Sequence, residues 1–139
     1  MDLERFVAAQ EPVYGRVKTE LLSGRKQSHW MWFVFPQVSG LGSSDMARRY
    51  AIASLDEARA YLAHPVLGMR LRECTALVLE TNAKSADDIF GYPDNLKFHS
   101  CMTLFARAAP EDTETEFRKA LDRFFDGKED ELTWQRLQN

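Results

Sequence analysis

Two short segments of the sequence carry side chains whose types suit a ligand site. In the first, His29 stands beside two indoles, Trp30 and Trp32, and Gln37 follows. An imidazole exchanges protons near neutral pH and an indole stacks on a flat ring, so this segment predicts a ring-binding site with His29 as a proton-transfer group. The alternative is that both indoles belong to the core and that His29 caps the preceding loop, because residues i and i+2 of a regular helix face different ways.

The second segment is a polar row of Asp94, Lys97, Ser100 and Thr103 at a spacing of three residues. Among apolar neighbours, such a row is costly to bury without a ligand or another partner. We expect Lys97 to supply charge for an anionic group, and Asp94 is the second candidate for proton transfer. The competing interpretation is an ordinary salt bridge between Asp94 and Lys97 on an exposed helix face.

These segments support two hypotheses about function. The first is an enzyme or binding domain for a small anionic, nucleotide-like ligand. Its catalytic residues would be His29 and Asp94, and its binding residues would be Trp30, Trp32, Gln37, Arg70, Lys97 and Ser100. The second is a non-catalytic protein-interaction or regulatory module whose aromatic residues are simply core. Only the first requires residues 29–37 and 94–103 to converge on one cleft.

Other kinds of site have weaker support. The loop Gly40-Leu41-Gly42-Ser43-Ser44 precedes Arg48 and Arg49, so its backbone N–H groups could hold an anion, but it lacks the third glycine of a dinucleotide fingerprint and a tight loop explains it better. The histidines and cysteines show no close pair with zinc-ligand spacing, so we predict no metal site, and nothing indicates a cofactor. The nucleophile motif of serine hydrolases, Gly-x-Ser-x-Gly, does not occur.

The elements that must position these residues are helices. Capping residues, prolines and glycines predict helices over 2–10, 12–24, 54–64, 65–80, 94–107 and 111–127, with a short helix after Ser85 and a final turn or two near the end. Apolar residues recur at helical spacing in these segments, and no tract shows sustained strand-like alternation. We predict an all-α domain of six to eight helices, with 66–80 and 94–107 packed centrally.

The apolar run from Trp30 to Phe35 is the main ambiguity. Its aromatic composition would also suit a buried strand. A solitary strand leaves its backbone groups without partners, and the sequence offers no second candidate strand. We therefore favour a buried helical turn that ends at Pro36.

Composition and charge limit the class of protein. The 139 residues are 45% hydrophobic and 12% aromatic, which suits one globular domain over 1–139. A net charge of −3 gives no electrostatic case for extended nucleic-acid binding. The sequence starts without a secretory signal, and its longest apolar run is too short to span a membrane, so we expect a cytoplasmic protein that does not bind membranes. Its two cysteines, Cys74 and Cys101, should be reduced.

Several longer stretches have an unusual composition. They are 24–37, 40–43, 50–52, 61–68, 89–91 and 100–105, together with Glu57, Ala58, Arg70, Leu71, Asp94 and Lys97. Together they resemble the bacterial domain-of-unknown-function family numbered eighteen-ten, which is sometimes mislabelled calpastatin. The resemblance runs from Leu3 to about Phe105, and it implies a mainly helical single domain with no established activity. The calpastatin label does not fit, because that inhibitor is disordered and this composition is globular.

A fainter similarity concerns the order of several short motifs. They are an acidic residue followed by Ala, then Leu-x-His-Pro, Leu-Gly-x-Arg and Phe-Gly-x-x-Asp. This order is similar to the layout of NADAR domains, which process ADP-ribose-linked substrates by N-glycosidic chemistry. It falls on Glu57, Ala58, His64, Pro65, Leu67, Gly68, Arg70, Gly91 and Asp94. The similarity implies an ADP-ribose-like ligand and an N-glycosidase type of enzyme.

Overall fold

Ten helices and no strand occur in the part of the chain that the computed structural model describes, residues 1–110 and 114–138. They are α1 (Glu4–Gln10), α2 (Tyr14–Leu22), α3 (Met31–Val34), α4 (Asp45–Arg49), α5 (Leu55–Ala63), α6 (Leu67–Glu80), α7 (Ala86–Phe90), α8 (Asp94–Ala108), α9 (Glu116–Phe125) and α10 (Glu131–Gln138). The all-α prediction is confirmed. The helices outnumber the six to eight predicted, because the short segments α3 and α4, of four and five residues, are helices as well.

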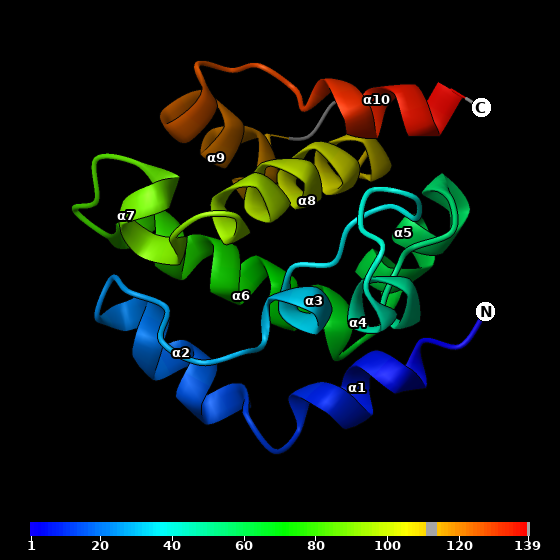
Figure 1. Cartoon of the computed structure of the whole chain (residues 1–139), viewed down its shortest axis with the longest axis horizontal. Coiled ribbons are helices and arrows are strands. Elements are labelled where there is room, and N and C mark those ends of the chain that lie inside the picture. The colour runs from blue at the N-terminus through cyan, green and yellow to red at the C-terminus, as the bar shows by residue number, and fades with distance from the viewer. Residues whose placement is uncertain (111–113, 139) are drawn as a thin grey trace.

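The two longest helices, α6 and α8, lie in the middle of the molecule, as predicted. Figure 1 shows α1 and α2 along one edge and α9 and α10 along the opposite edge, with α6 and α8 between them. Helix α6 packs against α2, α5 and α9, and α8 packs against α5, α7, α9 and α10. The apolar faces of these helices form one hydrophobic core. Helix α8, which carries the polar row, therefore packs directly against α10.

Several helix boundaries follow directly from the local sequence. The side chains of Ser54 and Ser85 accept hydrogen bonds from backbone amides three residues on, at the starts of α5 and α7. Gly24, with a φ of 79°, follows the end of α2, where the left-handed conformation favours glycine. His64 ends α5, and its Nδ1 accepts hydrogen bonds from the amides of Val66 and Leu67 at 3.1 and 3.2 Å. This histidine is a helix cap.

Other boundaries differ from the prediction by a few residues. Asp2 does not cap α1: the N-cap is Leu3, without a side-chain hydrogen bond, and the Asp2 carbonyl accepts a bond from Arg5. Pro12 lies before α2 rather than in its first turn. Helix α6 begins at Leu67 rather than Pro65, because the His64 cap sets its first turn. The predicted helix start near Glu111 lies outside the described residues, and α9 begins after the capping residue Thr115.

The apolar run from Trp30 to Phe35 contains the helical turn α3, as predicted. Phe35 is fully buried and makes edge-to-face contacts with Phe90 and Phe98, with ring centroids 5.7 and 5.2 Å apart. Five of the six side chains in the run are buried, and Trp32 is the one that is only half-buried. The turn therefore anchors the core with most of its side chains and directs one indole to the surface.

Cys74 and Cys101 are both free and buried, which confirms that they do not pair. Burial raises the pKa of the Cys74 thiol to about 12 and that of the Cys101 thiol well above its ordinary value. Because the thiolate is the reactive form, we expect neither thiol of the native protein to react quickly with Ellman's reagent at pH 8. The denatured, non-reduced protein should release two equivalents. A rapid native reaction, or none after denaturation, would contradict this account.

Two helical glycines should respond oppositely to the same substitution. A Cβ atom at Gly68 would lie 2.1 Å from the backbone oxygen of Leu62, whereas one at Gly15 would meet nothing within 4 Å. Gly68→Ala should therefore destabilise the protein by about 2–3 kcal/mol, because α5 and α6 must move apart. Gly15→Ala should stabilise it by about 0.5–1 kcal/mol through helix propensity. Chemical denaturation of both variants measures this difference, and equal effects would show that the α5–α6 contact is looser.

Candidate functional site

A surface cavity of about 330 Å³ lies where α3, the loop after it, α4 and the start of α8 meet. Trp32 comes from α3, Gln37 from the following loop, and Lys97 from the first turns of α8. The remaining lining residues are mainly small or apolar: Leu41, Gly42, Ser43, Ser44, Ala47, Pro93 and Leu96. Residues 29–37 and 94–103 thus contribute to one cavity, which is the convergence that the ligand-binding hypothesis requires.

The charge at this cavity comes from a three-residue ionic cluster. Asp94 accepts a salt bridge from Lys26 at 2.8 Å and another from Lys97 at 3.2 Å. The Lys97 ammonium also lies 5.2 Å from the centre of the Trp32 ring, in a cation–π contact. One carboxylate therefore serves two ammonium groups, and the cluster carries one positive charge in excess. Lys26 was not among the predicted site residues, although it precedes the aromatic run by only a few positions.

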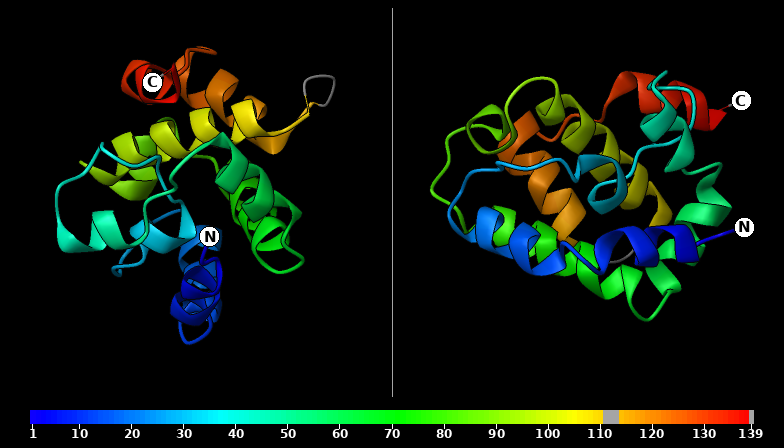
Figure 2. Two further views of the ribbon diagram at one scale, coloured as in Figure 1. Left: turned by 90° about the vertical axis from the view of Figure 1, so that its right-hand side faces the viewer. Right: turned by 60° about the horizontal axis from the view of Figure 1, so that its bottom comes forward.

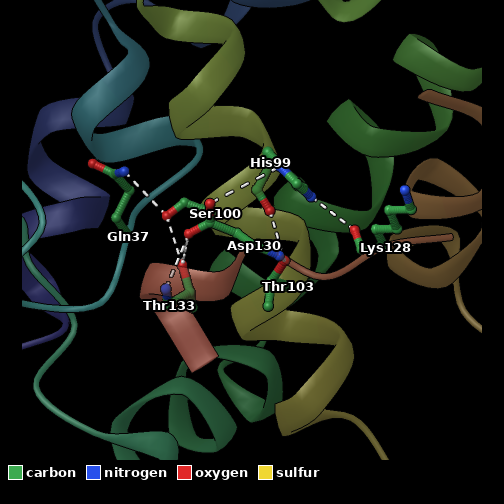
Figure 3. Close-up of polar contacts among 7 residues, drawn as sticks. All are labelled: Gln37, His99, Ser100, Thr103, Lys128, Asp130 and Thr133. Carbon is green, nitrogen blue, oxygen red and sulfur yellow. Dashed lines mark hydrogen bonds and ion pairs between the residues drawn. The ribbon is translucent and has the colours of Figure 1, made fainter. Parts of the chain in front are cut away.

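Gln37 is held from behind by a buried chain of hydroxyl groups. Its Nε2 donates to Ser100 Oγ at 3.1 Å, and Ser100 Oγ lies 3.0 Å from Thr133 Oγ1 on α10. Thr133 in turn donates to Asp130 Oδ2 at 2.6 Å from its hydroxyl and at 3.0 Å from its amide. Figure 3 shows this chain running from the Gln37 loop through α8 to the start of α10. Ser100 is thus a support behind the cavity and does not line it.

The same polar group fixes α10 on α8. The Asp130 amide donates to Thr103 Oγ1 at 2.8 Å, and His99 Nε2 lies 2.8 Å from the Lys128 carbonyl oxygen (Figure 3). The His99 ring is also stacked on Phe125 with centroids 3.9 Å apart. Asp130 is not among the residues predicted from the sequence, although an Asp just before a helix is a common capping residue. Its contact with the polar row of α8 has no local signal.

The loop that forms the outer wall of the cavity is held by α10 as well. Arg136 Nε donates to the Ser39 carbonyl at 3.0 Å. Gly40 has a φ of 95°, and a Cβ atom there would lie 2.4 Å from the Arg136 guanidinium carbon. In the right-hand view of Figure 2 this loop lies beside α10. Arg48, which the anion-loop interpretation invoked, pairs with Asp45 at 2.6 Å instead of lining the cavity.

Trp30, in contrast, is buried away from the cavity wall. Its Nε1 donates to Glu20 Oε1 at 2.9 Å, and the same carboxylate accepts bonds from the Gln27 amide, the Ser28 amide and the Ser28 hydroxyl. Burial alone would raise the pKa of the Glu20 carboxyl, but the hydrogen bonds from Ser28, Gln27 and Trp30 outweigh it and lower the pKa to about 2. For Trp30 the core interpretation of the sequence fits this geometry. Glu20 was not singled out from the sequence.

His29 and Arg70 lie outside the cavity lining. His29 is exposed in the loop before α3. Arg70, on α6, donates to Glu11 Oε1 at 2.6 Å and to Gln10 Oε1 at 3.3 Å, and its guanidinium covers the Tyr14 ring at 4.7 Å. It therefore joins α1 and α2 to α6. Of the predicted residues, the structure brings together Trp32, Gln37, Asp94, Lys97 and Ser100.

Comparison with known proteins decides the family. The family model described as "Protein of unknown function (DUF1810)" matches residues 1–137. The chain belongs to the DUF1810 family. A crystal structure of the conserved hypothetical protein Rv1873 from Mycobacterium tuberculosis is similar to this DUF1810 chain, with a TM-score of 0.95 and 54% sequence identity over 99% of this chain and 97% of that one. A comparison with curated proteins finds no match.

The similarity to NADAR domains is not shown by these comparisons. Several positions that suggested it have structural roles in this DUF1810 chain. His64 caps α6, Gly68 allows α5 and α6 to approach, and Glu57 accepts a hydrogen bond from the Ala53 amide at 2.7 Å. None of these three residues lines the cavity.

The described residues contain neither a candidate metal cluster nor a candidate membrane span. Within residues 1–110 and 114–138, no three His, Cys, Asp or Glu side chains are grouped so that they could hold a metal ion. None of the described helices combines the length and the apolar character needed to cross a membrane.

The hydrogen bonds to Glu20 make a prediction about acid stability. The lowered pKa means that Glu20 stabilises the fold fully above its unfolded value of 4.5, and that this contribution disappears as the pH falls toward 2. Glu20→Gln should therefore lower the free energy of unfolding by about 3 kcal/mol at pH 7. The difference from the wild type should shrink below pH 4.5. Urea unfolding across this pH range measures it.

Glu80 provides the matched control, because it is exposed at the end of α6. Glu80→Gln should leave stability within about 0.5 kcal/mol of the wild type at every pH. Equal effects of the two substitutions would mean that the four bonds to Glu20 do not favour its charged form.

Proposed function

We propose that this DUF1810 protein binds a small anionic ligand with a flat ring, such as a nucleotide, in the cavity between Trp32 and Lys97. The observation that carries the proposal is that an indole, an amide and an ammonium group from three separate segments line one cavity. Small-ligand sites combine a mostly apolar concave surface with a few placed polar groups, and this lining has that composition. The interaction-module hypothesis has no need for this convergence.

The charge balance supports an anionic ligand. Lys26 and Lys97 share the single carboxylate of Asp94, so an incoming anion would complete the pairing of Lys97. Lys97 is 23% exposed at its side chain and lines the cavity, whereas Lys26 is only 9% exposed and does not. Lys97 is therefore the cation that a ligand can reach. Trp32, already in contact with this ammonium, offers its ring for stacking.

Binding is better supported than N-glycosidase catalysis. A glycosidase needs a group that can transfer a proton at the reacting bond. His29 does not line the cavity, and both oxygens of Asp94 are engaged by ammonium groups. The geometry thus favours a domain that holds its ligand without an acid or base from these two residues.

Lys97→Met tests this proposal. Isothermal titration of the whole chain with a panel of 5′-mononucleotides and ADP-ribose should reveal a ligand for the wild type, and Lys97→Met should weaken its binding about ten- to hundredfold, because a charge-assisted contact is lost. The melting temperature should change little, since Asp94 keeps its closer partner Lys26.

Lys84→Met is the matched control, because Lys84 is exposed and lies outside the cavity. It should leave both affinity and stability unchanged. His29→Ala should likewise leave affinity unchanged if the cavity is the site. Failure of every compound in the panel to bind the wild type, or equal losses in Lys84→Met and Lys97→Met, would refute the proposal.

A further inference from the structure

The hydrogen atoms in the chain behind Gln37 can be assigned from its far end. At that end Asp130 Oδ2 accepts from the hydroxyl and the amide of Thr133. A carboxylate has no hydrogen to donate, so the single hydroxyl hydrogen of Thr133 points at Asp130. Thr133 Oγ1 is then only an acceptor toward Ser100, 3.0 Å away. Ser100 must donate its own hydroxyl hydrogen to Thr133.

This assignment fixes the orientation of the Gln37 amide. Because the Ser100 hydrogen is used on Thr133, Ser100 Oγ can only accept at its 3.1 Å contact with Gln37. The group facing Ser100 must therefore be the amide nitrogen of Gln37. Rotation of the amide by 180° would place two acceptors face to face beside a serine that is only 2% exposed, where an unmade hydrogen bond is costly.

The amide oxygen of Gln37 is left for a ligand. Figure 3 shows the nitrogen turned toward Ser100 and the oxygen turned away from it. This oxygen, Oε1, makes no hydrogen bond with any described residue, and it is not fully buried. Gln37 is one of the residues that line the cavity. Gln37 therefore offers an acceptor at a fixed place in the cavity wall.

We infer that Gln37 selects the ring of the ligand: the cavity prefers a ring with an N–H donor at its edge over the same ring without one. Ser100 and Thr133 act as positioning residues that prevent the amide from turning to suit other rings. The inference rests on the proposed function, since it names the chemistry of the ring that the same cavity takes. A rigid acceptor discriminates because a ligand that lacks the donor leaves it without a partner.

A matched pair of nucleotides tests the selection. AMP carries an exocyclic amine, and purine riboside 5′-monophosphate has the same ring and phosphate without it. Titration calorimetry on the whole chain should give about tenfold tighter binding of AMP, as one hydrogen bond to a fixed acceptor predicts. In Gln37→Met the ratio should fall to about one. In Ser100→Ala it should shrink, because the amide is free to turn.

Thr75→Val is the control, since it removes a buried hydroxyl that bonds the Leu71 carbonyl on α6 and lies outside the cavity. It should keep the wild-type ratio. Equal binding of AMP and purine riboside 5′-monophosphate by the wild type would overturn the inference while leaving ligand binding intact. Absence of binding by either nucleotide and by the wider panel would instead refute the proposed function, and the selection with it.

A measurement without any ligand tests the fixed orientation separately. In nuclear magnetic resonance spectra, the Gln37 side-chain amide should exchange its hydrogen with water about tenfold more slowly than that of the exposed Gln135, because one N–H is bonded to Ser100. The resonance is assigned by its loss in Gln37→Met. Ser100→Ala should remove the protection. An exchange rate equal to that of Gln135 in the wild type would overturn the inference whatever the nucleotides do.

Discussion

A row of hydroxyl groups on the buried side of α8 imposes the constraint on which this structure depends. Ser100 and Thr103 lie among core residues, and each needs a hydrogen-bond partner there. Ser100 takes both of its partners from other segments, Thr133 on α10 and Gln37 in the loop after α3. Thr103 donates to the His99 carbonyl within α8 at 2.9 Å and accepts from the Asp130 amide before α10. The hydrogen bonds of these two hydroxyls thus join three segments that are far apart in sequence. The cavity forms beside this junction.

Two carboxylates near the aromatic turn show how differently the fold uses negative charge. Glu20 accepts hydrogen bonds from neutral donors only, among them the Trp30 indole. These hydrogen bonds hold the segment before α3 in place. Asp94 is shared by two ammonium groups, so its surroundings retain positive charge. In a chain whose net charge is −3, this local excess of positive charge is the feature on which the proposed anion binding rests. Glu20 thus fixes the aromatic turn, and the two lysines that share Asp94 place positive charge beside it.

The sequence predicts most of this fold but only part of the site. Caps such as Ser54 and Ser85, and the apolar stripe of α6, act over a few residues, so their positions can be found from the sequence alone. Residue types nominated Trp32, Gln37, Lys97 and Ser100 as candidates, together with His29, Trp30 and Arg70, which do not line the cavity. Which indole faces the cavity did not follow from residue types, because α3 is a single turn and its side-chain directions depend on the core around it. Asp130 escaped notice because its partners lie on another helix.

The contact between Arg136 and the Ser39 carbonyl makes one wall of the cavity depend on α10. It joins residues 97 positions apart in the sequence. The other walls come from α3, which carries Trp32, and from α8, which carries Lys97. We therefore expect a local opening of α10 to release the loop wall while α3 and α8 stay in place.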